Sequence, residues 1–161
     1  MSSGSTVTVD ESFQGRVYPA GDPTPVTADA VRAFARAVRA AHPVHHDTDA
    51  ARAAGHADVV APPTFAVTLA QAAEAQYVSD PAAGIDFARV VHGEQQFRHH
   101  APIVAGDRLV AELHVDRVRL VRGNAMVTTR VELARADGTA VSTVTSMLVV
   151  RAPDESGEVA R

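Results

Sequence analysis

The hydrophobic pattern is helical in the first half of the chain and alternating in the second. Residues 61–78 read APPTFAVTLAQAAEAQYV, and the two opening prolines suit a helix start, where the lost N–H has no intrahelical partner. Polar side chains interrupt the run only at Thr68, Gln71, Glu74 and Gln76. The pattern predicts a helix of about 22 Å that is buried all round. It is too short and too polar to span a membrane, so other parts of the chain must wrap it.

A second, amphipathic helix is predicted upstream. Apolar residues recur at i, i+3, i+4 and i+7 from Val31 to Val38, and Thr27 suits the N-cap position. We expect this helix to end at His42-Pro43, because the residue before proline is pushed out of the helical region. A loop then leads to a short helix over residues 49–54, which Gly55 ends.

From Ile85 onward the hydrophobic period is two, as in strands. Apolar and polar residues alternate over residues 109–120, with a phase slip near Asp116-Arg117 that predicts a bulge. Gly123-Asn124 predicts a turn. This region therefore contains one long, bent strand followed by a reversal of the chain.

Two further strands are predicted, over residues 127–133 and 139–151, and Asp137-Gly138 between them is a strong hairpin signal. The last strand is apolar on both faces, as a central strand is. One buried helix followed by long antiparallel strands describes an α+β hotdog fold, a curled sheet around a central helix at about residues 63–78. The period alone leaves another α+β sandwich open.

Composition limits the function classes. A length of 161 residues fits one domain, which we place at residues 12–152, between a flexible N-terminus (1–11) and a flexible tail (153–161). The net charge of −4 and the thinly spread 15 Lys and Arg residues argue against nucleic acid as a partner. The absence of cysteine excludes disulfides and thiolate chemistry. The first residues show no secretory signal, so we expect a cytoplasmic protein without a membrane partner.

Three segments carry a resemblance to a known family. They are GHADVVAPPTF (55–65), RVVHGEQQF (89–97) and PIVAGDRL (102–109), and together they resemble the MaoC-like, FAS1-type dehydratases. The resemblance covers about residues 12–151. It is greatest to small single-domain actinobacterial members, among which is the accessory subunit of the mycobacterial (3R)-hydroxyacyl-ACP dehydratase. It implies a hotdog fold, a two-protomer assembly, acyl thioesters of CoA or acyl carrier protein as ligands, and reversible hydration of 2-enoyl thioesters.

The family's catalytic motif, D-x-N-P-x-H, is incomplete here. Pro43 and His45 match the proline and the histidine, His42 stands at the asparagine position, and Ala40 stands at the aspartate position. Elimination needs one group to remove a proton and another to protonate the departing hydroxyl, and alanine does neither. The resemblance therefore implies an accessory subunit, in a homodimer or beside a catalytic MaoC-like protein. A stand-alone hydratase that relies on His45, with Asp47 filling the gap, is an alternative.

Two other functions stay open. Glu74 on the central helix is the carboxylate that a hotdog thioesterase would need. We favour the interpretation that Gln71, Glu74 and Gln76 mark a solvated or interface-facing edge of the helix. The remaining alternative is a homodimer that binds acyl thioesters without catalysis.

The resemblance also implies the binding residues. In the family, backbone N–H groups at the start of the central helix hold the thioester carbonyl, which points to Pro63, Thr64 and Phe65. His92 and Gly93 are expected to line the acyl or phosphopantetheine path.

A metal site and a cofactor are not expected. His42, His45, His46 and Asp47 have a spacing that would align on a helix, and imidazole and carboxylate suit zinc. Pro43 makes this segment a loop, which removes that alignment.

Overall fold

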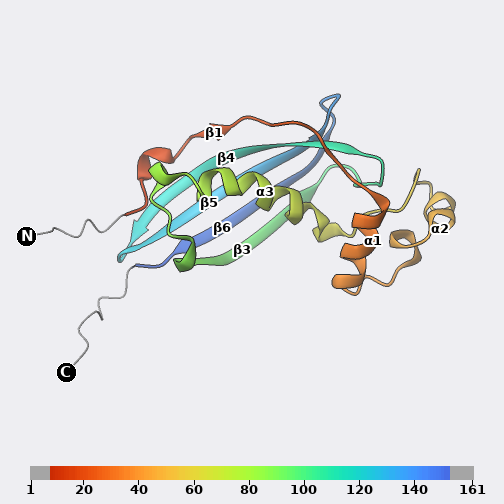
Figure 1. Cartoon of the computed structure of the whole chain (residues 1–161), viewed down its shortest axis with the longest axis horizontal. Helices are drawn as coiled ribbons and strands as arrows, with labels where there is room; N and C mark the ends of the chain where they lie inside the picture. Colours follow the sequence, from red (N-terminus) through yellow and green to blue (C-terminus); the bar gives the residue numbers. More distant parts are fainter. Residues whose placement is uncertain (1–7, 153–161) are drawn as a thin grey trace, which may run out of the picture.

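A six-stranded antiparallel sheet packs one of its faces against a long helix (Figure 1). The structure is a computed structural model that describes residues 8–152. The helices are α1 (Ala28–Ala37), α2 (Thr48–Ala53) and α3 (Ala66–Val78). The strands are β1 (Val17–Tyr18), β2 (Thr24–Pro25), β3 (Val90–His99), β4 (Arg108–Val121), β5 (Asn124–Arg135) and β6 (Ala140–Val150). Their order is β1-β4-β5-β6-β3, and β2 also pairs with β4. The predicted α+β hotdog fold is confirmed.

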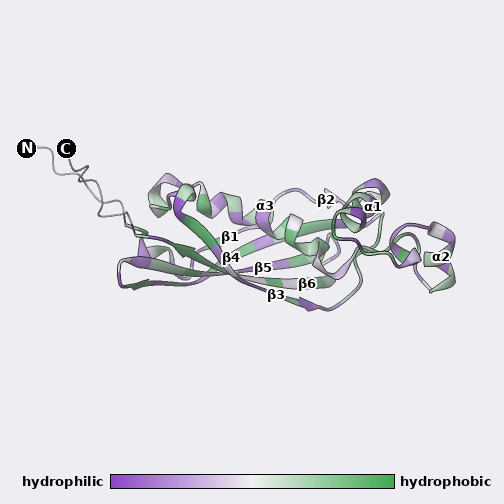
Figure 2. Ribbon diagram, turned by 90° about the horizontal axis from the view of Figure 1, so that it is seen from below, coloured by the Kyte–Doolittle hydropathy of each residue, from purple (hydrophilic) through white to green (hydrophobic). Residues whose placement is uncertain are grey.

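Helix α3 lies on one side of the sheet, while α1 and α2 gather beyond the end where α3 begins (Figures 1 and 2). A single 3₁₀ turn, Pro63–Phe65, precedes α3, so the helix expected at about residues 63–78 is confirmed. Its buried residues follow helical spacing: Ala66, Ala70, Ala73, Glu74 and Tyr77. Burial all round was wrong for the single chain, because the other side of the helix, which includes Gln71 and Ala75, is exposed.

The sheet keeps the predicted register features. The pairing of β4 with β5 shifts between Val115 and Arg117, at the predicted bulge, and Asp137-Gly138 joins β5 to β6. A second shift lies in β3 between His92 and Glu94, where Gly93 is the extra residue. A Cβ atom on Gly93 would come within 2.9 Å of the Met147 Cε atom, so a larger residue at this bulge would require the Met147 side chain to move.

Helix α1 ends at Ala37, five residues before the predicted stop. Arg39 adopts a left-handed conformation, with φ of 57°, and the Ala40 N–H donates to the Ala35 carbonyl at 2.8 Å. This closure is common at helix ends but usually uses glycine, so no local signal predicted it here. The short helix α2 agrees with its prediction to within one residue at each end, and the Asp47 carboxylate accepts from the Ala50 N–H at 2.8 Å.

Residues 8–11 belong to the packed part of the chain. Val9 is buried, and the Asp10 N–H donates to the Ala83 carbonyl at 3.0 Å. This differs from the flexible end expected up to residue 11. Residues 1–7 and the expected tail, 153–161, lie outside the described residues. Within the described part, none of the helices has the length and hydropathy that a membrane crossing needs.

Tyr77 places a polar group in the core. Its ring packs against Phe13 and Tyr18, at centroid distances of 5.6 and 6.3 Å. Across residues 8–152, its hydroxyl is the one buried side-chain polar group without a hydrogen-bond partner. Burial raises the pKa of Tyr77 to about 12, because desolvation disfavours the phenolate.

We expect Tyr77→Phe to leave the free energy of unfolding at pH 7 unchanged or to raise it by about 1 kcal/mol, since no hydrogen bond is lost. The pKa of Tyr77 rises on folding from 10.0 to about 12. Neutral Tyr77 should therefore contribute fully to the free energy of unfolding of the wild type below pH 10. The wild type should lose about 2–3 kcal/mol of this free energy as the pH approaches 12. Urea titrations from pH 7 to 12 measure both effects. Tyr18→Phe is the matched control, and a variant Tyr77→Phe that is less stable at pH 7 would contradict the assignment.

Candidate functional site

The histidine loop, residues 42–46, is hydrogen-bonded to the segment that leads into α3. His42 begins a 3₁₀ turn, Pro43–His45, and the Nδ1 atom of His45 lies 2.6 Å from the Val60 carbonyl oxygen. The Val60 N–H donates in return to the Val44 carbonyl at 2.9 Å. A carbonyl only accepts, so Nδ1 of His45 carries the proton. In the neutral ring, Nε2 is then the nitrogen that can accept a proton.

Ala40 leaves this loop without the carboxylate of the family's dyad. Its carbonyl lies 2.7 Å from Nε2 of His46, which holds the backbone of residue 40 beside the histidines. Asp47 does not fill the gap, because its carboxylate caps α2. Among residues 8–152, no acidic side chain is hydrogen-bonded to His45, and no three histidine or acidic side chains are grouped so that they could hold a metal ion. The loop thus presents one imidazole with a defined tautomer.

The start of α3 borders a small pocket of about 190 Å³. Its lining includes Pro63 and, from the end of β3, His99, whose Nδ1 lies 3.1 Å from the Ser142 hydroxyl. Of the three residues predicted here, Pro63 has no N–H, and the Phe65 N–H donates to the Pro62 carbonyl at 2.9 Å. The amide of the exposed Thr64 has no hydrogen bond within the described chain and is the donor that a ligand can use.

Phe65 has a structural role through its side chain. The ring is buried and meets the Phe34 ring of α1 edge to face, with centroids 5.4 Å apart. This contact ties the start of α3 to α1. The aromatic pair therefore positions the turn that carries Thr64.

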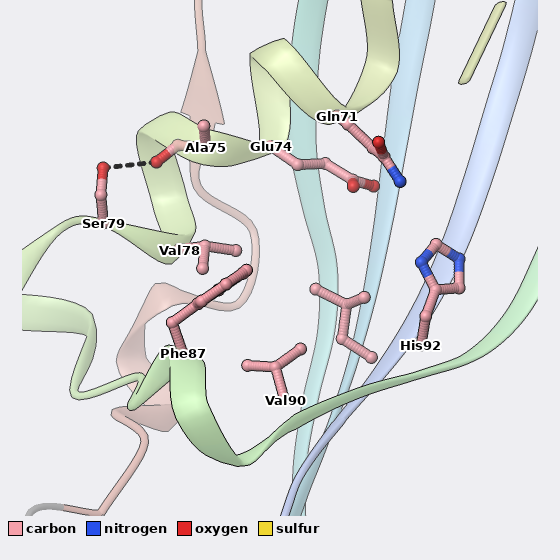
Figure 3. Close-up of a pocket in the computed structure, with 9 residues that line it drawn as sticks. Gln71, Glu74, Ala75, Val78, Ser79, Phe87, Val90 and His92 are labelled. Atoms are coloured by element: carbon pink, nitrogen blue, oxygen red, sulfur yellow. Dashed lines mark hydrogen bonds between the residues drawn. The ribbon is translucent and has the colours of Figure 1, made fainter. Parts of the chain in front are cut away.

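A larger pocket of about 510 Å³ opens beside the second half of α3 (Figure 3). Glu74 lines it but is only 5% exposed, and its Oε1 atom accepts from the Thr129 hydroxyl at 2.7 Å. A solvated edge is therefore wrong for Glu74, although Gln71 and Gln76 are exposed, and an interface-facing edge stays a prediction. His92 also lines this pocket, and Gly93 lies in the adjacent bulge.

The predicted binding residues thus fall in two places. Pro63 borders the small pocket at the start of α3, whereas His92 lines the larger pocket further along the helix. Sequence reasoning missed His99, although its place two residues after the partly buried Phe97 puts it on the same face of β3.

A curled antiparallel sheet around one long helix defines the hotdog class of folds. The model of the FAS1-like dehydratase domain region matches residues 12–144. The chain belongs to this MaoC-like dehydratase family, which confirms the resemblance of its three segments.

Relatives and solved structures agree with this assignment. A UPF0336 protein of Clavibacter michiganensis is 53% identical over 146 residues, which cover 91% of this chain and 98% of the relative. One of Saccharopolyspora erythraea is 48% identical over 155 residues, or 93% and 97% of the two chains. The HadBC (3R-hydroxyacyl-ACP dehydratase) complex of Mycobacterium tuberculosis contains a chain with a TM-score of 0.77 and 30% identity, over 85% of this chain and 96% of that one. A MaoC-like dehydratase aligns with a TM-score of 0.82 and 32% identity, over 90% of this chain and 44% of that one.

Proposed function

We propose that the chain is an accessory subunit of a cytoplasmic (3R)-hydroxyacyl-thioester dehydratase, which also hydrates 2-enoyl thioesters of CoA or acyl carrier protein. The observation that carries this proposal is half of a dyad. His45 keeps its proton-accepting Nε2 free, while Ala40 brings only a methyl group to the place of the carboxylate.

The chemistry explains why half a dyad is not enough. Dehydration breaks the C–H bond next to the carbonyl and the C–O bond of the hydroxyl, and it forms the C=C bond and water. One group must take the proton while another supplies a proton to the departing hydroxyl. His45 alone would have to do both in one turnover. A protomer with the complete pair would not have this difficulty.

The thioester carbonyl, in this proposal, lies at the turn formed by Pro63, Thr64 and Phe65. The Thr64 amide donates to it, and the start of α3 favours the negative charge that develops on the oxygen. His92 and Gly93 line the path further along α3. Residues 12–152 act as one hotdog domain.

The uncovered edge of the sheet supports a second protomer. β3 is an edge strand, with Val91 49% exposed, and Phe87 just before it is 76% exposed. Exposed edges with apolar side chains are open to pairing with another chain. The HadBC structure is a complex, as is the ChsH1-ChsH2 structure, which shares the fold at 19% identity and a TM-score of 0.67. We propose a heterodimer with a catalytic MaoC-like protein, with a homodimer as the alternative.

The test is co-expression with a MaoC-like protein encoded nearby that has an intact D-x-N-P-x-H motif. We expect light scattering to detect a stable complex, and crotonyl-CoA hydration to require the partner. A stable monomer at micromolar concentration in the presence of that partner would contradict the assembly. Tight binding of acyl thioesters by a homodimer without turnover would instead indicate the non-catalytic alternative.

One observation favours a second candidate function, thioester hydrolysis. Glu74 is buried at the edge of a pocket, and Thr129 holds one of its oxygens, as a carboxylate that attacks or activates water would require. Release of free CoA from acyl-CoA by the chain alone, lost in Glu74→Gln, would establish it. Hydrolysis that is unchanged in Glu74→Gln, or absent, would exclude it.

A further inference from the structure

The larger pocket has the form of a ligand site in its own right. Its volume of about 510 Å³ lies in the range of pockets that bind small molecules. Val78, Phe87 and Val90 stand along one side, and the lining also includes Leu148 (Figure 3). These walls suit an aliphatic chain, because burying it there removes apolar surface from water.

The least exposed polar residue in the pocket lining is Glu74. Oε1 is occupied by the Thr129 hydroxyl. Oε2 has no hydrogen-bond partner among residues 8–152, and the Tyr77 hydroxyl is the one fully enclosed side-chain nitrogen or oxygen of those residues that lacks one. Oε2 is therefore not fully enclosed by protein, and Figure 3 shows the Glu74 carboxyl group pointing into the pocket. A residue that is 5% exposed thus offers a free acceptor to whatever enters.

The polar side of the pocket also contains two groups that both donate and accept hydrogen bonds. The Gln71 amide and the His92 ring lie on the same side of the pocket as the Glu74 carboxyl, one on α3 and one on β3 (Figure 3). An amide presents both N–H and C=O, and a neutral imidazole presents one donor and one acceptor. A ligand group that donates to Glu74 can therefore accept from Gln71 or His92.

This arrangement discriminates between ligand classes. A plain alkyl chain would cover the Glu74 oxygen without replacing its hydrogen bonds to water, which is unfavourable. A fatty-acid carboxylate would meet the Glu74 carboxyl, and two acidic groups at one place oppose each other's ionisation. A hydroxyl group both donates and accepts and carries no charge. It matches all three polar groups.

We infer that this pocket binds an uncharged aliphatic alcohol, with its hydroxyl between Glu74, Gln71 and His92 and its chain along the apolar wall. The site is separate from the histidine loop: Glu74 lies nine residues after Phe65, about 13 Å along α3. His92 also belongs to the proposed acyl path and Phe87 to the proposed protomer contact, but the probes below measure binding to the chain alone, so a missing hydratase activity leaves the inference untouched.

The test compares three probes of similar size on the wild-type chain: 1-octanol, its isomer 1-methoxyheptane, and octanoate. The ether accepts hydrogen bonds but donates none, so the hydroxyl proton is the variable. We expect 1-octanol to shift the methyl NMR signals of Val78, Val90 and Leu148. We expect it to bind at least about tenfold more tightly than either other probe, as for the loss of one hydrogen bond to a buried acceptor. Equal affinity for the alcohol and the ether, tighter binding of octanoate, or no shift at these methyl groups would each overturn the inference.

A variant isolates the role of the carboxyl. Glu74→Gln keeps the shape and an acceptor for Thr129 but turns an amide N–H toward the pocket, so the preference for alcohol over ether should fall to about twofold or less. Glu94→Gln, the same change on an exposed residue of β3 outside the pocket lining, should keep the wild-type preference. An unchanged preference in Glu74→Gln would overturn the assignment. If Glu74→Gln does not fold, the wild-type probe series decides the question by itself.

Discussion

Replacing Ala40 by aspartate is expected to raise the rate at which the chain alone hydrates a short 2-enoyl-CoA by about 10²- to 10⁴-fold, the usual contribution of one acid–base group. The reason is geometric. His46 holds the carbonyl of residue 40 beside the loop at 2.7 Å, and Val60 already fixes the ring of His45. The new carboxyl would thus join a histidine whose tautomer is set.

The measurement is hydration of crotonyl-CoA by the wild type, Ala40→Asp, and Ala40→Asp combined with His45→Ala. The double variant should lose the whole gain. Ala41→Asp is the matched control, since it adds the same charge at the neighbouring exposed position and should give no gain. A wild-type rate near 10 per second, typical of enzymes, would mean that another residue supplies the acid, and the accessory role would be wrong. No activity in either form, with full activity when a catalytic partner is added, would leave His45 a remnant and place the chemistry wholly in the partner.

Phe65→Ala should lower the free energy of unfolding by about 3–5 kcal/mol, a large part of the stability of an ordinary domain. The ring is 6% exposed and packs edge to face against Phe34, so its removal leaves a cavity where α1 meets the start of α3. We also expect acyl-thioester affinity to fall, because the turn that carries Thr64 loses its anchor.

Phe87→Ala is the matched control for this prediction. The same atoms are removed from a side chain that is 76% exposed, and the change in stability should stay within about 0.5 kcal/mol. Urea unfolding of both variants at the same pH provides the comparison. Equal losses would show that Phe87 is covered in solution, as a second protomer would do. A loss below about 1 kcal/mol in Phe65→Ala would contradict the packing described here.

The fold was largely predictable from local signals. Asp137-Gly138 and the phase slip near Asp116-Arg117 each act within a few residues, and both are where they were expected. The end of α1 was not predictable, because it depends on Arg39 adopting a positive φ without a glycine to indicate it. Local sequence signals indicate the common ways in which a helix ends, and α1 ends in a less common one.

The site was only partly predictable. The helical period did indicate that Glu74 is buried, since Ala70, Glu74 and Tyr77 fall at i, i+4 and i+7. The polar residues near Glu74 in the sequence suggested a solvated edge instead. The partner of His45 could not be found in this way. Val60 lies fifteen residues further on, and its contact with the imidazole exists only after the two loops have folded together.

The extra residue at the Gly93 bulge determines which side chains of β3 face the larger pocket. His92 pairs with Leu148 and Gln95 with Ser146, both on the helix-facing side, although they are three positions apart and a regular strand would place them on opposite faces. If β3 kept Gly93 but paired without the bulge, Gly93 would stand opposite Leu148 and the first part of the strand would turn over. His92 would then point away from Glu74. The polarity of this cavity thus depends on one extra residue in a strand as well as on the side chains that line it.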